Sequence, residues 1–237
     1  MKYKCPILLG ATGTGKTSLV AGVAKFMPVE IIACDKFYSY SYFNASVCHS
    51  KDDYTELRAN LIGFRHPTEP LLDRNLFSDL IYDTARRICN KNIMPIVEGC
   101  SVGYISAIIQ NSEKYSDIQF FPKIGVLLQK FTDIKSFFKN KVIALIENGA
   151  LQEVEYAIKN NWTDSYIIKK SMLANPLYRY IEREISLETA IDIATENFIR
   201  IAKEEEEKFR SFTDVIWIEH ISGKTEKAIK EIVSIIS

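Results

Sequence analysis

Cysteine is scarce in this sequence, and its five cysteines include no Cys-x-x-Cys pair and no metal-ligand spacing. An odd number without such spacing argues against both a disulfide framework and a cysteine-based zinc site. Cys5, Cys34 and Cys89 lie inside apolar runs. The simplest interpretation is that these cysteines are small buried side chains of a protein in a reducing compartment.

An excess of charge of either sign is also lacking, because 30 basic and 30 acidic residues cancel. Bulk charge therefore does not draw this chain to nucleic acid, although a local basic groove stays compatible with it. No apolar run approaches the length of a membrane span, and the first residues lead directly into an apolar strand without room for a signal peptide. We expect a soluble, cytoplasmic protein with no membrane partner.

Short apolar runs alternate with helical patterns in the first half of the chain. The runs lie at residues 5–10, 30–35, 93–99 and within 118–128. Patterns with apolar residues three and four apart follow at residues 17–26, 76–89 and 101–110. This alternation favours a parallel sheet.

Helical patterns dominate the chain from residue 131 onward. Thr132 and Asp133 are suited to cap a helix that ends near Asn148 and Gly149, and Ser186 is suited to cap a long helix. Residues 215–220 then predict a late strand, and the last dozen residues predict a closing helix.

The stretch GATGTGKTS, residues 10–18, matches the pattern G-x-x-x-x-G-K-[ST] at Gly10, Gly15, Lys16 and Thr17. It lies between a predicted strand and a predicted helix, which is the context that this phosphate-binding loop requires. Its backbone N–H groups suit a polyphosphate, Lys16 adds positive charge and the Thr17 hydroxyl suits Mg²⁺. The motif does not specify a reaction, because kinases, NTP hydrolases and other transferases share it.

These patterns predict an α/β fold, with a P-loop NTPase-like parallel sheet flanked by helices and a helical subdomain in the second half. We expect a P-loop core over residues 1–130 and a helical subdomain packed on it over residues 131–210. The last strand and closing helix, residues 211–237, are expected to return to the core.

Two carboxylates end predicted strands at the sheet edge where ligands bind in such folds. Asp35 suits a general base, a water-mediated Mg²⁺ ligand or a helix cap, and Glu98 suits Mg²⁺ or a brace for the loop. A kinase of a small metabolite would need arginines that clamp the transferring phosphoryl group. The second half offers mainly lysines, which argues mildly against that reaction.

The segments GATGTGKTS, ACDKFYSY, FRHPTEPLLD and IVEGCSVGYISAI resemble, in order and spacing, the isopentenyltransferases that prenylate N6 of adenine. Residues 185–209 are also similar to the late helix of that family, so the resemblance covers most of the chain. It implies that the loop holds the diphosphate of dimethylallyl diphosphate, with Mg²⁺ as cofactor. The bond that breaks is then carbon–oxygen, and diphosphate is the leaving group.

The resemblance also implies roles for individual residues. Asp35 would take a proton from adenine N6, and Thr12 would help to orient the base or the phosphate. Diphosphate would be bound by Gly13, Thr14, Gly15, Lys16 and Thr17, with Thr17 also on the metal, and by Lys141 and Lys123. The acceptor would contact Arg65, Ser101 and Ser46.

Several of these residues have an alternative interpretation. Lys141 and Lys123 also suit solvated surface lysines, and the match at Lys123 needs a shift of one residue. Ser101 also suits an ordinary N-cap. The aromatic residues of 37–43 suit either a wall around isoprenoid and adenine or the anchors of a packed loop. The acidic run 203–208 is interpreted as the solvated face of a helix.

The sequence favours the adenylate dimethylallyltransferases, which make cytokinins, over the tRNA dimethylallyltransferases of the same family. VEGCS resembles the Glu-Gly-x-Ser of the adenylate enzymes, and no room for a tRNA-gripping domain exists between Ser101 and Lys141. The balanced charge likewise offers no basic surface for RNA, although residues 103–105 resemble the tRNA enzymes. Tyr38 stands at a family glutamine position, and residues 173–180 lack the acid of the cytokinin enzymes.

We therefore expect dimethylallyl transfer to N6 of AMP, or of ADP or ATP. Three alternatives stay open: a tRNA dimethylallyltransferase, a P-loop kinase of a small metabolite, and a nucleotide-binding regulator without catalysis.

Overall fold

The computed structural model of the protein describes residues 3–48, 57–128, 133–220 and 225–237. Six parallel strands form its main sheet in the order β4-β3-β5-β2-β7-β8, and β1 pairs with β6 in a second, two-stranded sheet. The strands are β1 (Tyr3–Lys4), β2 (Ile7–Gly10), β3 (Val29–Ala33), β4 (Ala59–Asn60), β5 (Met94–Gly99), β6 (Ile118–Gln119), β7 (Lys123–Leu127) and β8 (Val215–Glu219). The helices are α1 (Lys16–Val23), α2 (Arg74–Cys89), α3 (Val102–Gln110), α4 (Ile134–Leu145), α5 (Leu151–Lys159), α6 (Tyr166–Lys170), α7 (Ala174–Ile181), α8 (Leu187–Arg210) and α9 (Thr225–Ile236).

Helices cover both faces of the main sheet, which explains why its central strands β3, β5 and β2 are mostly apolar and almost completely buried. Ile7 and Leu9 of β2 pack on one face with residues of α2 and α3, whereas Leu8 packs on the other face with residues of α1 and α9. The alternation of side chains along a strand thus buries every residue of β2. The α/β class and the parallel, helix-flanked sheet predicted from the sequence are confirmed.

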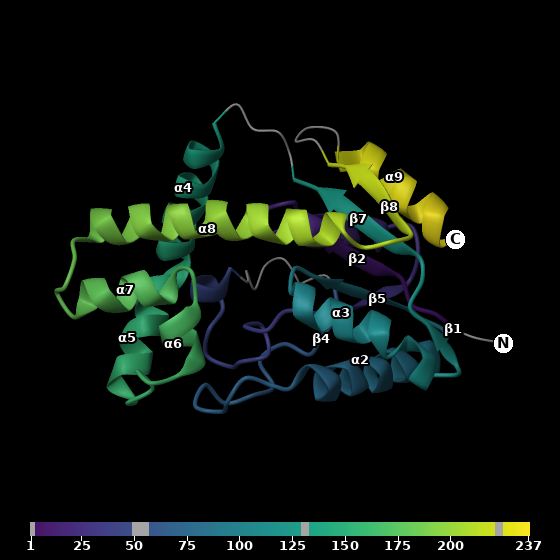
Figure 1. Ribbon diagram of the computed structural model, residues 1–237, viewed down its shortest axis with the longest axis horizontal. Helices are drawn as coiled ribbons and strands as arrows, with labels where there is room; N and C mark the ends of the chain where they lie inside the picture. The colour runs from purple at the N-terminus through teal and green to yellow at the C-terminus, as the bar shows by residue number, and fades with distance from the viewer. Residues whose placement is uncertain (1–2, 49–56, 129–132, 221–224) are drawn as a thin grey trace.

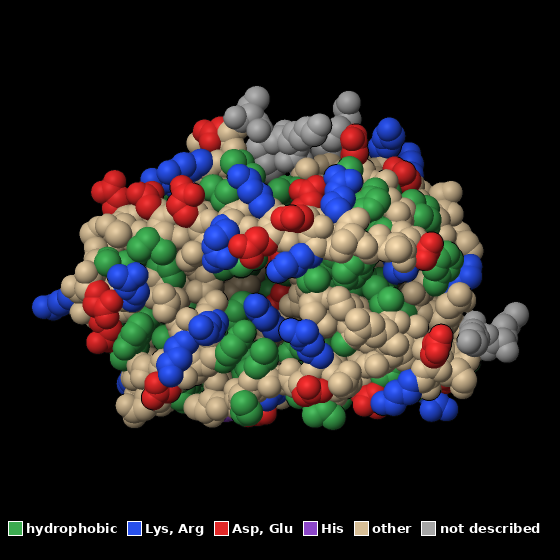
Figure 2. Space-filling model, viewed as in Figure 1, with side chains coloured by type: hydrophobic (Ala, Val, Ile, Leu, Met, Phe, Trp, Pro, Cys, Tyr) green, Lys and Arg blue, Asp and Glu red, His purple; other side chains and the backbone are tan. Residues whose placement is uncertain are grey.

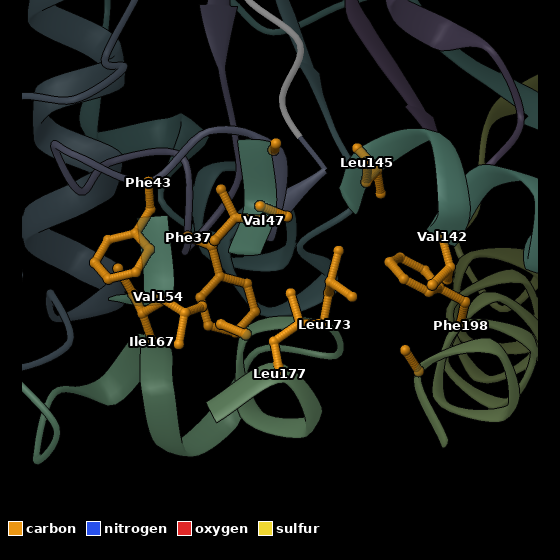
Figure 3. Packing of buried hydrophobic residues seen from close by; sticks show 14 of the residues in the cluster. Phe37, Phe43, Val47, Val142, Leu145, Val154, Ile167, Leu173, Leu177 and Phe198 are labelled. Atoms are coloured by element: carbon orange, nitrogen blue, oxygen red, sulfur yellow. The ribbon is translucent and has the colours of Figure 1, made fainter. Parts of the chain in front are cut away.

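The helices α4 to α7 gather beside the sheet, and the long helix α8 runs from them across to the strands (Figure 1). Their shared hydrophobic cluster also includes Phe37, Phe43 and Val47, which belong to the loop that follows β3 (Figure 3). The helical part therefore packs around a loop of the sheet part. The division at residues 130/131 lies outside the described residues, and the three-part division of the chain stays a proposal.

The structure confirms most of the predicted elements and divides one of them. Asp133 and Ser186 cap α4 and α8, accepting hydrogen bonds from the N–H groups of Ser136 (2.9 Å) and Thr189 (3.1 Å). The chain continues past Gly149 through a π-helical turn, Ile146–Ala150, into α5. Gly149 has φ 104°, a left-handed conformation that glycine adopts without strain, so the two helices meet there at a kink.

Among the described residues, no helix combines the length and the apolar character that crossing a membrane requires.

Glu153 of α5 holds the loop after β3 through four hydrogen bonds. Its carboxylate accepts from the backbone N–H groups of Asn44 (2.9 Å), Ala45 (3.1 Å) and Ser46 (3.0 Å) and from the Ser46 hydroxyl (2.5 Å). A charged acceptor for several buried donors is expensive to remove, because each donor then loses its partner.

We expect Glu153→Ala to lower the free energy of unfolding by about 3 kcal/mol, since buried donors without partners cost about 1–3 kcal/mol each. Urea denaturation followed by circular dichroism would measure this. Glu155→Ala, at an exposed position of the same helix, is the matched control and should be nearly neutral. Equal losses in both variants would show that the four bonds add no stability.

Candidate active site

The loop between β2 and α1 has the curled backbone that its sequence predicts. Gly13 (φ 90°) and Gly15 (φ 77°) adopt left-handed conformations, and Gly15 leads into the first turn of α1. A Cβ atom at Gly15 would lie 2.5 Å from the His220 ring, so only glycine fits there. His220 in turn donates from Nδ1 to the carbonyl of Thr14 (2.8 Å) and supports the loop from behind.

Lys16 lies folded over this loop. Its Nζ donates to the carbonyls of Gly10 and Ala11, both at 3.0 Å, and approaches the Thr14 hydroxyl at 3.4 Å. The amine is buried beside the N-terminal end of α1, where backbone N–H groups and the helix dipole favour an anion. The loop therefore brings a buried positive charge to the site.

A cavity of about 620 Å³ opens next to the loop. Figure 2 shows a hollow near the middle of one face, with Lys and Arg side chains around its rim. Strand ends, loops and the helices α3, α4, α6 and α8 all contribute to the lining. Of the residues predicted from the sequence, the cavity brings together Thr12, Gly13, Gly15, Lys16, Thr17, Asp35, Ser101 and Lys141.

Asp35 follows β3 and is only 6% exposed, although it lines the cavity. Its Oδ1 accepts from the backbone N–H of Phe37 (2.7 Å), and its Oδ2 accepts from the thiol of Cys100 (3.0 Å) and the hydroxyl of Ser101 (3.4 Å). These donors fix the orientation of the carboxylate. Burial and the negative charges of Glu205 and Asp35 raise the pKa of the Cys100 thiol, which keeps the thiol a hydrogen-bond donor.

Ser101 stands at the N-cap position of α3, but its side chain makes no cap hydrogen bond. The hydroxyl instead accepts from the backbone N–H of Lys36 (3.1 Å) and reaches Asp35. The ordinary N-cap interpretation is therefore wrong for this residue. Ser101 links the start of α3 to the loop after β3.

Glu205 of α8 is the main functional candidate that the sequence reasoning missed. Its Oε2 accepts from the backbone N–H of Thr12 at 2.8 Å, within the phosphate-binding loop. Burial raises the pKa of Glu205, and the nearby charge of Asp35 adds to this, whereas Thr12 and Lys16 oppose it. The interpretation of residues 203–208 as a solvated face is wrong here, because Glu204, Glu205 and Lys208 line the cavity.

The remaining lining combines aromatic, apolar and basic side chains. Within residues 37–43, Phe37 and Tyr38 line the cavity, whereas Tyr40 and Phe43 are buried in the core and Tyr42 is exposed. Further apolar lining comes from Leu71, Val47, Phe137, Tyr166, Met172 and Ile201. Basic side chains reach the cavity from Lys36, Arg74, Lys141, Lys170 and Lys208.

Lys123 does not reach this site. It begins β7 opposite Ile7, which begins β2, so it lies at the sheet edge away from the loop. Its Nζ pairs with Asp214 at 3.8 Å. The predicted contact of Lys123 with diphosphate is therefore wrong, because a strand of five residues separates it from the cavity edge.

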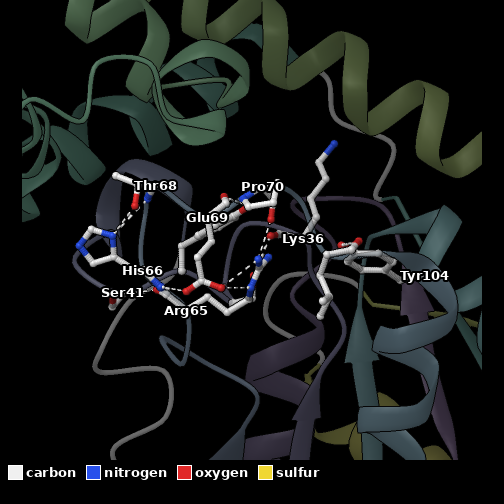
Figure 4. Close-up of polar contacts among 11 residues, drawn as sticks. Lys36, Ser41, Arg65, His66, Thr68, Glu69, Pro70 and Tyr104 are labelled. Carbon is white, nitrogen blue, oxygen red and sulfur yellow. Dashed lines mark hydrogen bonds and ion pairs between the residues drawn. The ribbon is translucent and has the colours of Figure 1, made fainter.

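Arg65 is also absent from the lining of the cavity. It is 7% exposed, and its guanidinium donates to Glu69 (3.1 and 3.2 Å) and to the carbonyl of Pro70 (2.6 Å). Figure 4 shows these contacts within the loop, while the Lys36 side chain extends away from them. Because Glu69 already neutralises it, Arg65 organises the loop and does not contact the acceptor as predicted.

Ser46 and Thr14 likewise turn away from the cavity. Ser46 is completely buried and donates its hydroxyl to Glu153, so the predicted contact with the acceptor is wrong. Both donors of Thr14 are engaged within the loop, because its hydroxyl (2.9 Å) and its backbone N–H (3.3 Å) donate to the carbonyl of Ala11.

The oxygen ligands in the cavity suit Mg²⁺ that arrives with a polyphosphate. The described residues hold no group of three or more His, Cys, Asp or Glu side chains arranged to bind a metal. Thr17, Asp35 and Glu98 nevertheless line the same cavity. Mg²⁺ is usually held by one or two carboxylates together with waters and substrate phosphates, so this set fits it without a protein cage.

Known proteins with similar sequences include an adenylate isopentenyltransferase and a tRNA dimethylallyltransferase. The chain is 27% identical over 207 residues to adenylate isopentenyltransferase 7, mitochondrial, of Arabidopsis thaliana, which covers 83% of this chain and 61% of the relative. It is 31% identical over 114 residues to the tRNA dimethylallyltransferase of Finegoldia magna, which covers 48% of this chain and 36% of the relative. The chain thus spans less than two thirds of the length of these curated relatives.

The fold resembles the crystal structure of the tRNA isopentenylpyrophosphate transferase of Bacillus halodurans. The TM-score is 0.84 at 18% sequence identity, covering 99% of this chain and 96% of the other. The family model for isopentenyl transferase matches residues 3–147, which is more than half of the chain. The resemblance predicted from the motifs is confirmed, and this chain belongs to the isopentenyl transferase family.

Proposed function

We propose that this protein is a Mg²⁺-dependent adenylate dimethylallyltransferase. It transfers a dimethylallyl group from dimethylallyl diphosphate to N6 of AMP, or of ADP or ATP, and gives a cytokinin-type product. The observation that carries this proposal is one cavity that joins the phosphate-binding loop to the buried, oriented carboxylate of Asp35.

The donor occupies the loop side of the cavity in this proposal. Backbone N–H groups of Gly13, Gly15 and Lys16 bind the diphosphate, and the Lys16 and Lys141 amines balance its charge. Lys141 has no ion-pair partner among the described residues, so its charge is available to a ligand. Mg²⁺ held by Thr17 and the diphosphate would supply further neutralisation of the leaving group.

The acceptor presents its exocyclic amine to Asp35. As the bond between N6 and C1 of the dimethylallyl group forms, the bond between C1 and the diphosphate oxygen breaks. The Asp35 carboxylate takes the N6 proton, and diphosphate leaves with the electron pair. The donors Cys100 and Ser101 hold the carboxylate in place, so no reorientation is needed when the proton moves.

The apolar lining serves the same reaction. Water would capture an allylic carbon as its bond to diphosphate weakens, and a wall of Phe137, Tyr166 and Met172 excludes it. Phe37 packs against Tyr166 at a ring-centroid distance of 5.7 Å, which joins the two sides of this wall.

A tRNA acceptor is the second candidate, because the relatives of this chain include enzymes of both names. A P-loop kinase of a small metabolite is less well supported. Arg74 is the only arginine among the described residues that line the cavity, whereas phosphoryl transfer relies on clamping arginines.

Mass spectrometry tests the proposed function directly. The purified protein is incubated with Mg²⁺ and dimethylallyl diphosphate, and with either AMP or unmodified tRNA. We expect an AMP product heavier by one dimethylallyl group. Product from tRNA alone would replace the adenylate assignment by the tRNA one. ATP consumption with small metabolites, and no prenylated product, would favour the kinase.

Asp35→Asn should lower kcat about 10²- to 10⁴-fold, because it removes the general base. The affinity for dimethylallyl diphosphate should stay unchanged, since the loop is intact. Asp83→Asn, at an exposed position of α2, is the control and should leave both quantities unchanged. Full turnover in the Asp35 variant would rule out its role as general base.

Glu205 makes donor binding dependent on pH in this proposal. Its carboxylate accepts a hydrogen bond from the backbone N–H of Thr12 in the loop. A charged carboxylate at this position repels diphosphate. Burial raises the pKa of Glu205, so the neutral form persists to higher pH than for an exposed glutamate. Donor affinity should therefore be highest below this raised pKa and fall as the pH rises through it.

Glu205→Gln keeps an oxygen for Thr12 without the charge. We expect it to bind dimethylallyl diphosphate on the order of tenfold more tightly than the wild type at pH 8, with the difference disappearing as the pH falls. Isothermal titration calorimetry at several pH values would show this, with the exposed Glu207→Gln as control. Weaker binding by the Glu205 variant at all pH values would contradict a repulsive role.

A further inference from the structure

A second cavity of about 580 Å³ adjoins the candidate active site. The two cavities share four lining residues, Arg74, Val102, Gly103 and Lys208. The second cavity continues along α3 to Ser106, Ala107 and Gln110, and Asp73 and Asn75 of the α2 start close it on the other side. The four shared residues, here called the neck, border both cavities.

Two cations from separate helices meet at this neck. Arg74 is the first residue of α2, and Lys208 lies in the last turn of α8. The Arg74 guanidinium lies against the backbone of Gly103, since a Cβ atom at Gly103 would come within 3.0 Å of its Cζ and Nε atoms. The absence of a side chain at position 103 thus leaves room for the guanidinium beside α3.

Neither cation has an ion-pair partner among the described residues, whereas two arginines of α8 do. On α8, Arg200 pairs with Glu204 and Arg210 pairs with Glu206, each at 3.0 to 3.2 Å. The charges of Arg74 and Lys208 are therefore available to an anionic ligand.

The carboxylates near the neck are already engaged. Asp73 lines the second cavity, but its Oδ1 accepts from the N–H groups of Asn75 (2.8 Å) and Leu76 (3.2 Å) and caps α2. Glu204 pairs with Arg200, and Glu205 accepts from Thr12. No carboxylate of these cavities is thus paired with Arg74 or Lys208 in the described part of the chain.

The neck lies close to the carboxylate that faces the acceptor. Ser101 reaches Asp35 at 3.4 Å, and Gly103, two residues further along the chain, contacts Arg74. A nucleotide whose base amine contacts Asp35 can therefore run past the start of α3 toward Arg74. Lys16, whose amine lies within the loop, also lines the first cavity, and the diphosphate of the donor is proposed to bind there.

We propose that Arg74 and Lys208 bind the 5′-phosphate of the acceptor nucleotide at this neck. The inference rests on the proposed function, because it takes an adenine nucleotide as the acceptor. It also gives the acceptor phosphate a site of its own, since two anions that shared the cations of the loop would repel each other. Arg74 and Lys208 thereby take the place of Arg65, for which a contact with the acceptor was predicted.

Comparison of AMP with adenosine isolates the phosphate. Binding is measured by isothermal titration calorimetry without donor, and KM is measured with dimethylallyl diphosphate and Mg²⁺. The variants are Arg74→Gln, Lys208→Gln and the double variant. The matched control is Lys203→Gln, which removes an exposed lysine of α8 that lines neither cavity.

We expect the double variant to raise Kd and KM for AMP about 10- to 100-fold, because hydrogen bonds between charged groups are the strong ones. Each single variant should give a smaller rise. Binding of adenosine and of dimethylallyl diphosphate should stay unchanged, which also shows that the variants are folded. Lys203→Gln should match the wild type throughout.

The outcomes separate this inference from the proposed function. An unchanged affinity for AMP in the double variant, or an equal loss for adenosine, would overturn the phosphate site even if AMP is prenylated. AMP binding that depends on Arg74 and Lys208, without any prenylated product, would retain the phosphate site and reject the proposed function. Failure of the wild type to bind AMP would reject the inference together with the adenylate assignment.

Discussion

The parallel direction of all six strands in the main sheet is the constraint on which the site depends. Leu9 pairs with Gly99, and Ala33 pairs with Glu98, so β2, β3 and β5 all end at one edge of the sheet. The phosphate-binding loop, Asp35 and Ser101 each follow one of these strands. The parallel pairing of the strands aligns their carboxyl ends. Segments that are distant in the sequence therefore meet in one cavity at that edge of the sheet.

This constraint also explains which parts of the site could be predicted from the sequence. The loop residues, Asp35 and Ser101 follow buried strands. The position of a residue directly after a strand is set by that strand, so it can be predicted from the neighbouring sequence. Glu205, Arg74 and Lys208 come from helices whose position depends on tertiary packing. An acidic run such as 203–208 has the composition of a solvated face, and only the path of α8 over the loop brings Glu205 to Thr12.

The errors of prediction have a related physical cause. A basic residue in a motif that resembles the family indicates a positive charge near the site. The direction of its side chain, however, depends on the residues that contact it in the folded chain. Glu69, four residues after Arg65, captures the guanidinium within the loop. Lys123 stands at the beginning of its strand, and the length of β7 separates it from the ligand edge. The five longer strands of the main sheet and the helices α2, α3 and α8 were predictable because burial repeats along them. The two-residue strands β1 and β4 were not predicted, and neither they nor such captures leave a periodic signal.

The chain is neutral overall, but its cavity gathers charges of both signs. Equal numbers of acidic and basic residues cancel over the full sequence, and the cavity is lined by lysines as well as by Asp35, Glu204 and Glu205. Lys16 lies at the loop and Arg74 at the neck, with the carboxylate of Asp35 also lining the cavity. A ligand with a single anionic end satisfies only one of the two cationic regions. Under the proposed function, the diphosphate of the donor would use the loop and the phosphate of the nucleotide would use the neck, so that both neutral reacting ends meet near Asp35.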